Sequence, residues 1–367
     1  LLAAGRHAEA FDQAGRASEE ATRAWCAAQT AKPGEFRAFW CHAANGVAGM
    51  NWDQAAELLA RNGFTAVLPN MLWGGVSFGR SSLLPQASAT RDDIADCLAA
   101  CRRHGLKIHI WKVNWNTGWA VPKAFLDQMG AEGRLQMDAA GKVEPWLCPS
   151  NPANQKLEID SMVEVARNYA VDGLHFDYIR YPDGNHCFCP GCRERFGKAT
   201  GDALADWPKA AQNGGRLRAQ WLDWRRSNIT TVVKGVSEQA RAVRPGIQLS
   251  AAVFRNWAVD RDGVGQDWKL WCDRGWLDFV CPMDYTTSGY QFAGEVTKQL
   301  GWAGKVPVYP GIGASATGIA MSPEQVIEQI KIARAKGAPG FTIFNYGANE
   351  AANLVPMLGL GITRPTK

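Results

Sequence analysis

The chain has 367 residues, of which 46% are hydrophobic and 20% charged, and this balance excludes a mainly disordered or fibrous protein. It carries 40 Lys and Arg against 35 Asp and Glu with no block of basic residues, so we do not expect nucleic acid as a partner. No apolar run approaches the roughly 20 residues that a membrane-spanning helix needs. The 16 Trp residues exceed what core packing usually requires, and sugar faces stack on aromatic rings, so composition favours a carbohydrate ligand.

The first segment, residues 1–34, is predicted to be a helical extension that packs on the main body. Apolar and small residues recur at helical spacing from Phe11 to Trp25, and Pro33-Gly34 ends the pattern. The sequence starts with Leu1 rather than Met, so we expect a targeting segment upstream of it.

Residues 35–367 alternate between short strand-like runs and helical stretches. Glycines such as Gly63, Gly105 and Gly337 precede several of the runs, as C-cap residues of helices that lead into strands. This alternation predicts a single (β/α)8 TIM barrel, whose long connections after the third, fourth and fifth strands would build the active face. The strands are expected at residues 36–42, 65–70, 107–114, 173–179, 248–254, 279–284, 306–311 and 340–345.

The fourth strand carries the strongest chemical signal. In the run VDGLHFDYIRYP, residues 171–182, period-2 alternation places His175 and Asp177 on one face, which we expect to point into the barrel. An inward Asp at the exit of a barrel strand lies at the active face. The alternative is a structural ion pair of Asp177 with Arg180.

The sixth strand repeats this pattern and ends in Asp284. Two carboxylates that face one cavity can cleave a glycosidic bond, and we expect Asp177 as nucleophile or stabiliser and Asp284 as acid/base. The alternative for Asp284 is a capped turn. Other carboxylates near strand exits could take its place, namely Glu144, Asp260, Asp262, Asp267 and Glu350.

Polar and aromatic side chains near the predicted strand exits are expected to bind the sugar. Polar tips near a strand exit can hold hydroxyl groups, and Trp rings in the following loops can stack on sugar faces. The candidates are Asn70, Trp73, Lys112, Asn114, Trp115, His175, Arg180, Tyr181, Trp257, Tyr309 and Asn345.

Three of the ten cysteines, Cys187, Cys189 and Cys192, fall within six residues in a Pro-Gly turn. This spacing suits either a structural zinc site or a disulfide. Zinc needs a fourth ligand, which Cys148 or His186 would supply. The remaining cysteines lie in apolar segments and are expected to be buried thiols.

These residues resemble the family 10-like glycosylhydrolases of bacteria, from about Glu35 to Asn349. The likeness rests on GEFRAFW at residues 34–40, NMLWGG at 70–75, WLCPSNP at 146–152, and VDGLHFDYIRYP followed by CFCPGCRERF. It implies a TIM-barrel hydrolase of carbohydrates, usually exported, with Asp177 as the catalytic candidate. Many relatives have a second Asp at the position of Tyr178 and Pro-Gln-x-Tyr where this chain has Pro282-Met283-Asp284-Tyr285, so the likeness does not extend to Asp284.

Together these features predict a glycoside hydrolase that cleaves a polysaccharide or glycan strand and requires no cofactor for catalysis. Two alternatives stay open. One is a carbohydrate-binding barrel without catalysis, favoured by Tyr178 in place of the second Asp. The other is a metal-dependent deacetylase of amino sugars. That chemistry needs an open site of His and Asp ligands, but His42, His109 and His175 lie on three different strands without close HxH spacing.

Overall fold

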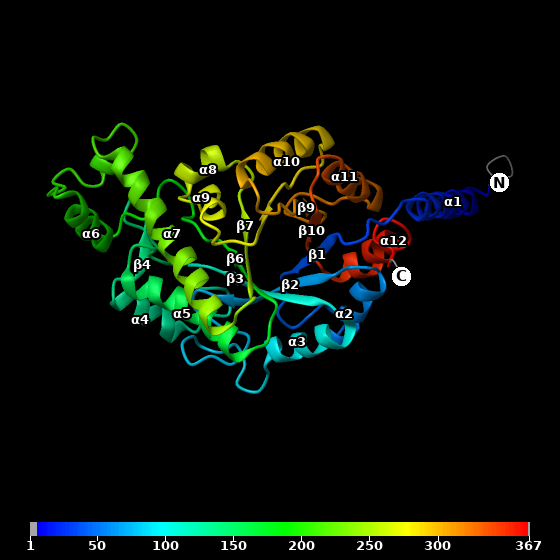
Figure 1. Cartoon of the computed structure of the whole chain (residues 1–367), viewed down its shortest axis with the longest axis horizontal. Helices are drawn as coiled ribbons and strands as arrows, with labels where there is room; N and C mark the ends of the chain where they lie inside the picture. The colour runs from blue at the N-terminus through cyan, green and yellow to red at the C-terminus, as the bar shows by residue number, and fades with distance from the viewer. Residues whose placement is uncertain (1–5, 366–367) are drawn as a thin grey trace.

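The computed structural model describes residues 6–365, and its centre is a nearly closed barrel of eight parallel strands (Figure 1). The strands lie in the order β8-β7-β6-β3-β2-β1-β10-β9, and bridges from Val280 to Val308 and from Met283 to Gly311 bring β8 beside β9. Their bounds are β1 Phe36–Cys41, β2 Ala66–Trp73, β3 Lys107–Val113, β6 Gly173–Asp177, β7 Gln248–Val253, β8 Phe279–Pro282, β9 Gly311–Gly313 and β10 Gly340–Phe344. The predicted TIM barrel is confirmed, with β6 as its fourth strand.

Helices surround the barrel and follow the strands in sequence. The main ones are α2 Trp52–Arg61, α3 Asp93–His104, α5 Pro152–Asn168, α7 Arg218–Val243, α10 Gly289–Ala303 and α11 Pro323–Ala335. Their ends carry local signals: the Asn51 side chain caps α2 in a capping box, and α3 ends at Gly105 with φ of 70°. Such a left-handed C-cap favours glycine, which explains why glycines mark the helix-to-strand turns.

The long connections after the third, fourth and fifth strands contain secondary structure of their own. After β3 come α4 Lys123–Ala131 and a hairpin of β4 Leu135–Met137 with β5 Val143–Leu147. After β6 come α6 Pro190–Thr200 and the short helix η1 Lys209–Ala211, and after β7 come α8 Trp257–Gly263 and α9 Trp268–Asp273. The last helices of the described residues are η2 Glu350–Leu354 and α12 Val355–Gly359.

The hydrophobic core has two layers, as the alternation along the strands dictates. Ala38, Leu68, Trp111 and Phe279 belong to the layer inside the barrel, whereas residues such as Phe39 belong to the layer between strands and helices. Each buried strand therefore has one face in each layer, and the phase of the alternation decides which side chains can reach the barrel mouth.

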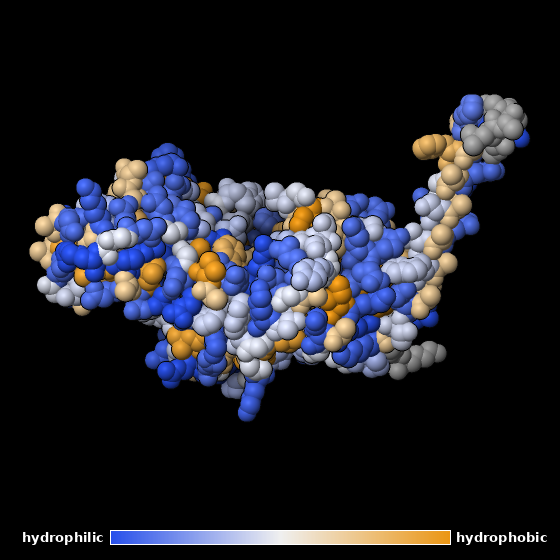
Figure 2. All heavy atoms as spheres, turned by 90° about the horizontal axis from the view of Figure 1, so that it is seen from above, coloured by the Kyte–Doolittle hydropathy of each residue, from blue (hydrophilic) through white to orange (hydrophobic). Residues whose placement is uncertain are grey.

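The N-terminal helix α1 spans His7–Ala27 and projects from the body in both views (Figure 1, Figure 2). Its C-terminal half packs on α11 and α12, where Thr22 Oγ1 donates to Glu324 Oε1 at 2.5 Å and Cys26 is buried. Phe11 near its start is 84% exposed. Residues 1–5 of the predicted extension lie outside the described part of the chain.

The seventh strand differs from its prediction. We expected it at residues 306–311, but β9 is only Gly311–Gly313, and Val308 joins the sheet through a single bridge. Pro307 and Pro310 lack a backbone N–H, so this stretch cannot form a continuous ladder.

No helix between residues 6 and 365 is long and apolar enough to cross a membrane.

Candidate active site

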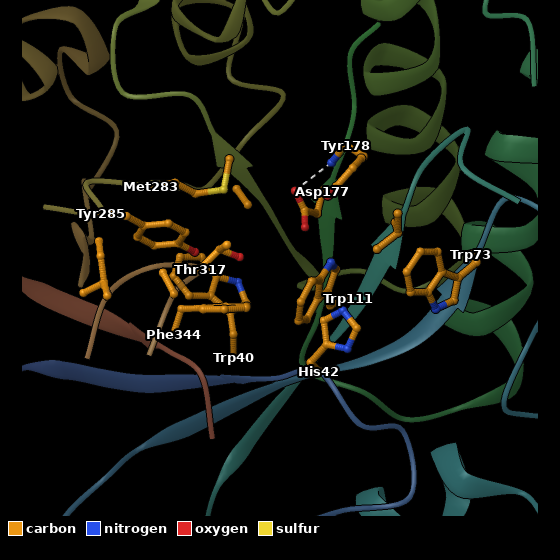
Figure 3. A pocket seen from close by; sticks show the side chains of 14 residues that line it. Trp40, His42, Trp73, Trp111, Asp177, Tyr178, Met283, Tyr285, Thr317 and Phe344 are labelled. Atoms are coloured by element: carbon orange, nitrogen blue, oxygen red, sulfur yellow. Dashed lines mark hydrogen bonds between the residues drawn. The ribbon is translucent and has the colours of Figure 1, made fainter. Parts of the chain in front are cut away.

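A pocket of about 410 Å³ lies at the C-terminal ends of the barrel strands (Figure 3). Every strand, or the loop after it, contributes at least one side chain. The lining residues are Trp40, His42, Trp73, Trp111, Val113, Asp177, Tyr178, Ala252, Met283, Tyr285, Ala316, Thr317, Ile319 and Phe344. Most of this wall is aromatic or aliphatic, which suits the faces of sugar rings.

Asp177 ends β6 and is the only carboxylate in the pocket wall among residues 6–365. Its Oδ1 accepts a hydrogen bond from the backbone N–H of Tyr178 at 2.7 Å. Burial raises the pKa of this carboxyl from 3.8 to about 6, although the Tyr178 N–H and the charge of Arg180 act in the opposite direction. A carboxyl with this pKa exchanges a proton readily near neutral pH.

The residue after Asp177 adopts a backbone conformation that is rare for a bulky side chain. Tyr178 has φ of 51°, in the left-handed region, which is costly for a non-glycine residue and is concentrated at functional sites. Its ring packs on Trp146 at 5.4 Å between centroids and lines the pocket. The turn therefore puts the Tyr178 ring into the pocket wall while the Tyr178 backbone N–H bonds to the carboxylate.

Several polar groups in the pocket have no partner within the described chain. The indole N–H of Trp111 is buried close to Asp177 and lowers the pKa of that carboxyl, but it forms no hydrogen bond of regular geometry (Figure 3). Burial raises the pKa of the Tyr178 and Tyr285 hydroxyls, so both stay protonated as donors at neutral pH. These groups are free to bind the hydroxyls of a ligand.

Arg180 does not form the ion pair considered as the alternative role of Asp177. Its guanidinium lies over the rings of Tyr178 and Phe254, 4.6 and 4.4 Å from their centroids. Its Nη1 donates to the carbonyls of Tyr181 and Pro182. Arg180 thus holds the backbone after β6, outside the pocket wall.

Asp284 does not reach the pocket, contrary to the expectation of a facing carboxylate pair. Met283 and Tyr285 both line the pocket, so alternation turns Asp284 between them to the opposite side. There it is fully buried, and its Oδ1 accepts from Gln299 Nε2 of α10 at 2.6 Å. Burial raises the pKa of this carboxyl well above its usual range.

Lys112 and Asn114 also point away from the pocket. Trp111 and Val113 occupy the inward positions of β3, so their neighbours face α5. Lys112 Nζ lies 3.3 Å from Glu158 Oε2 and 2.7 Å from Ser161 Oγ, and Asn114 Nδ2 donates to Glu158 at 2.7 Å. The structure therefore does not bring either residue to the pocket, and both belong to a buried polar network behind the strand.

Among the other expected sugar ligands, Trp73 lines the pocket and His175 lies inside the barrel, where its Nε2 accepts from the indole N–H of Trp40 at 2.9 Å. Asn345 is not in the pocket wall, but its Oδ1 accepts from the backbone N–H of His42, so it braces a lining residue. Tyr309 stacks on Phe36, the first residue of β1, at 4.2 Å. That position is at the opposite end of the barrel, so Tyr309 cannot contact a ligand in the pocket.

Four further candidates lie outside the pocket wall. Asn70, Trp115 and Tyr181 are buried, and the Tyr181 hydroxyl accepts from Asn228. Trp257 donates its indole N–H to Asp267 at 2.7 Å. We expected these side chains to contact the sugar, whereas the structure places them in the packed interior or against other side chains.

The alternative carboxylates are engaged elsewhere. Their partners are Lys142 for Glu144, the Asn256 N–H for Asp260, Arg226 for Asp262, Trp257 for Asp267, and the Gly347 N–H for Glu350. None of them lines the pocket.

Sequence reasoning missed most of the aromatic wall. Trp40 and Trp111 occupy inward strand positions, and Tyr285 and Phe344 lie at strand exits. Inward alternation along β1 and β3 is a signal that could have found the two Trp residues, but it required knowing the phase of each strand.

The three histidines do not form a common site. His175 bonds to Trp40 and Ser250, His109 lies between Phe36 and Phe279 deeper in the barrel, and His42 stands at the pocket rim beside Trp73. Among the described residues, the group with spacing for a metal ion is Cys148, Cys187, Cys189 and Cys192, away from the pocket.

The barrel and the pocket at its mouth define a TIM-barrel protein whose candidate site lies at the C-terminal ends of the strands. The chain is similar in fold to the glycoside hydrolase domain of PgaB (BpsB) from Bordetella bronchiseptica, with a TM-score of 0.67 and 14% identity over 84% of this chain and 94% of that one. It is also similar to the catalytic domain of β-amylase from Paenibacillus polymyxa, with a TM-score of 0.63 and 13% identity over 90% and 95% of the two chains. At sequence identities this low, the similarity shows only that the chains share a fold.

In sequence, the chain belongs to the glycosyl hydrolase-like 10 family, which matches residues 79–325. It is 24% identical to glycosyl hydrolase YngK of Bacillus subtilis over 55% of this chain and 42% of that protein. It is 23% identical to glycosyl hydrolase DigH of Escherichia coli K12 over 62% and 56% of the two chains. The chain thus spans about half the length of these relatives.

Proposed function

We propose that this protein is a glycoside hydrolase that cleaves an oligosaccharide or polysaccharide, with Asp177 as the group that transfers the proton. The observation that supports it most is the position of Asp177, the single carboxylate among the described residues that line an aromatic pocket. Membership of a glycosyl hydrolase-like family supports the same reaction class.

The proton-donor role for Asp177 follows from its environment. A general acid must hold its proton at the working pH and then give it to the leaving oxygen, which favours a pKa near neutrality. Burial brings the pKa of Asp177 to about 6. This departs from the nucleophilic role expected from sequence, because a nucleophile must be ionised and would pair with a second carboxylate as acid.

A second catalytic group is needed to stabilise the positive charge that develops on the sugar ring. With Asp284 turned to Gln299, the described pocket supplies no second carboxylate. In substrate-assisted hydrolysis, the substrate's own 2-acetamido group attacks the anomeric carbon. We therefore propose a glycan of 2-acetamido sugars as substrate, with its methyl group against the apolar wall formed by residues such as Trp111 and Met283.

The hydrolase proposal is tested by incubating the full chain with a panel of glycans and measuring released reducing ends. Asp177→Asn should lose turnover by at least about 100-fold while still binding the glycan, because general acid catalysis contributes factors of about 10²–10⁴. Asp260→Asn is the matched control, a half-buried carboxylate outside the pocket, and should keep activity. Full turnover by Asp177→Asn would refute the assignment.

Two comparisons separate the finer roles. On an aryl glycoside whose leaving group needs no proton, Asp177→Ala should retain far more of the wild-type kcat than on a glycan, whereas loss of a nucleophile would affect both substrates equally. Matched aryl glycosides of N-acetylglucosamine and glucose test assistance by the substrate. Equal rates on these two would exclude the acetamido mechanism and leave the hydrolase proposal intact.

The same panel distinguishes the alternatives stated from the sequence. Glycan binding without reducing ends from any substrate would indicate a carbohydrate-binding barrel. Release of acetate without chain cleavage would indicate a deacetylase.

A further inference from the structure

Four cysteines from separate segments meet beside the loop that follows β6. Cys148 follows β5, Cys187 and Cys189 lie in that loop, and Cys192 is in the first turn of α6. All four are buried, and their Sγ atoms lie within 4.8 Å of one another. Cys148 Sγ is 3.4 Å from Cys192 Sγ and 3.7 Å from Cys189 Sγ.

This spacing fits a tetrahedral metal ion. With Zn–S bonds of about 2.3 Å, the edge of a tetrahedron of sulfur atoms is about 3.8 Å, close to both distances. A disulfide needs sulfur atoms at about 2.05 Å, and all four cysteines are free thiols in the structure. One disulfide would involve only two of the four sulfur atoms and would not explain why the other two lie beside them.

Hydrogen-bond donors surround the sulfur atoms. The backbone N–H groups of Met137 and Cys192 donate to Cys187 Sγ and Cys189 Sγ, both at 3.4 Å. The guanidinium of Arg195 donates to Cys148 Sγ at 3.6 Å. Donors of this kind stabilise the negative charge of metal-bound thiolates and orient the ligands.

We propose that Cys148, Cys187, Cys189 and Cys192 bind one structural Zn²⁺. Of the two candidates for the fourth ligand, Cys148 completes the set, whereas His186 pairs through Nδ1 with Asp183 at 2.8 Å. Four protein ligands leave no open coordination position, so the ion stabilises structure and takes no part in hydrolysis.

The ion would join the loop after β6 to the β4–β5 hairpin. The same two segments are already linked by the N–H of Phe188, which donates to the Met137 carbonyl at 2.7 Å. Trp146, two residues before Cys148, packs on Tyr178 in the pocket wall. The site therefore holds in place the segment that supports Tyr178, the neighbour of Asp177.

The test measures metal in the full chain, purified without chelator from cells grown with both zinc and iron. Elemental analysis should give one zinc per chain, and exchange for Co²⁺ should give the visible spectrum of a tetrahedral thiolate site. Cys148→Ser should lose the metal and melt at a lower temperature. Cys272→Ser is the control, because Cys272 is also a buried thiol but lies outside the cluster, and it should keep the zinc.

Three results would overturn the proposal: no metal with a disulfide among these cysteines, iron in place of zinc, or full zinc content in Cys148→Ser. Should that variant fail to fold, the zinc content and Co²⁺ spectrum of the wild-type chain decide alone. A rise in KM after zinc removal would extend the inference to the pocket, and this readout rests on the proposed function. The measurement of metal content does not rest on the proposed function, so the zinc proposal and the hydrolase proposal can each fail without the other.

Discussion

The indole N–H of Trp40 donates to Nε2 of His175 at 2.9 Å inside the barrel. Because that nitrogen accepts, the proton of the neutral ring is on Nδ1, which donates to Ser250 Oγ at 2.8 Å. Burial keeps the pKa of His175 well below its usual value, so the ring stays neutral. Trp40 lines the pocket, and His175 is therefore a positioning residue for its floor.

Replacing His175 by Leu should destabilise the protein and weaken ligand binding. The Trp40 N–H would be left buried without a partner, which costs about 1–3 kcal/mol. We expect this loss in urea unfolding, together with a several-fold rise in KM. His109→Leu is the control, since both ring nitrogens of His109 are buried without partners and the variant should keep or gain stability. Equal effects of the two variants would contradict the role of His175.

The pH dependence of kcat/KM should show that the protonated form of Asp177 is the active one. A proton donor with a pKa of about 6 is active below that value, so kcat/KM should fall as pH rises through about 6. The profile of Asp260→Asn should be unchanged. A rise in kcat/KM through the same pH range would instead assign the ionised form of Asp177 to catalysis.

Asp177→Asn should be inactive but more stable than the wild type at pH 8. The pKa is about 6 when folded against 3.8 unfolded, so the folded state binds more protons between these values. Stability from this group is then greatest at low pH and falls as pH rises, by up to about 3 kcal/mol. Asn removes this loss and can still accept the Tyr178 N–H. Denaturant unfolding at pH 4 and pH 8 measures the effect, and a variant less stable at pH 8 would contradict it.

Asp284→Asn should keep turnover within about threefold of the wild type. The carboxyl lies outside the pocket, and an Asn oxygen can accept from Gln299 as Asp284 does. Burial raises its pKa well above the unfolded value, so this carboxyl opposes folding at neutral pH and the variant should be more stable than the wild type at pH 8. Loss of turnover comparable to that of Asp177→Asn would return Asp284 to the catalytic machinery.

Lys112→Met should reduce stability without changing KM. The substitution leaves Glu158 buried without its cation, a change that typically costs about 3–5 kcal/mol. The double variant with Glu158→Gln should recover most of this loss in urea unfolding. A raised KM in both variants would instead favour the sugar-binding role expected from the sequence.

The sequence by itself determined the barrel and the location of Asp177. Both depend on local patterns: strands that alternate with helices, glycines at helix ends, and the period-2 run that places His175 and Asp177 on one face. Such patterns arise from the geometry of neighbouring residues and need no knowledge of the rest of the chain.

Only the tertiary structure decided which face of each strand points inward and how far along the barrel axis each residue lies. Alternation places Lys112 and Asn114 on one face of the strand but does not determine whether that face points to the pocket or to α5. For the same reason the sequence did not show that Met283 and Tyr285, and not Asp284, point into the pocket. Tyr309 points inward, yet it is level with Phe36, because the seventh strand pairs continuously only from Gly311 and Tyr309 lies at its entry end. The convergence of Cys148 with the three cysteines after β6 depends on contacts between segments far apart in the chain, which no local pattern contains.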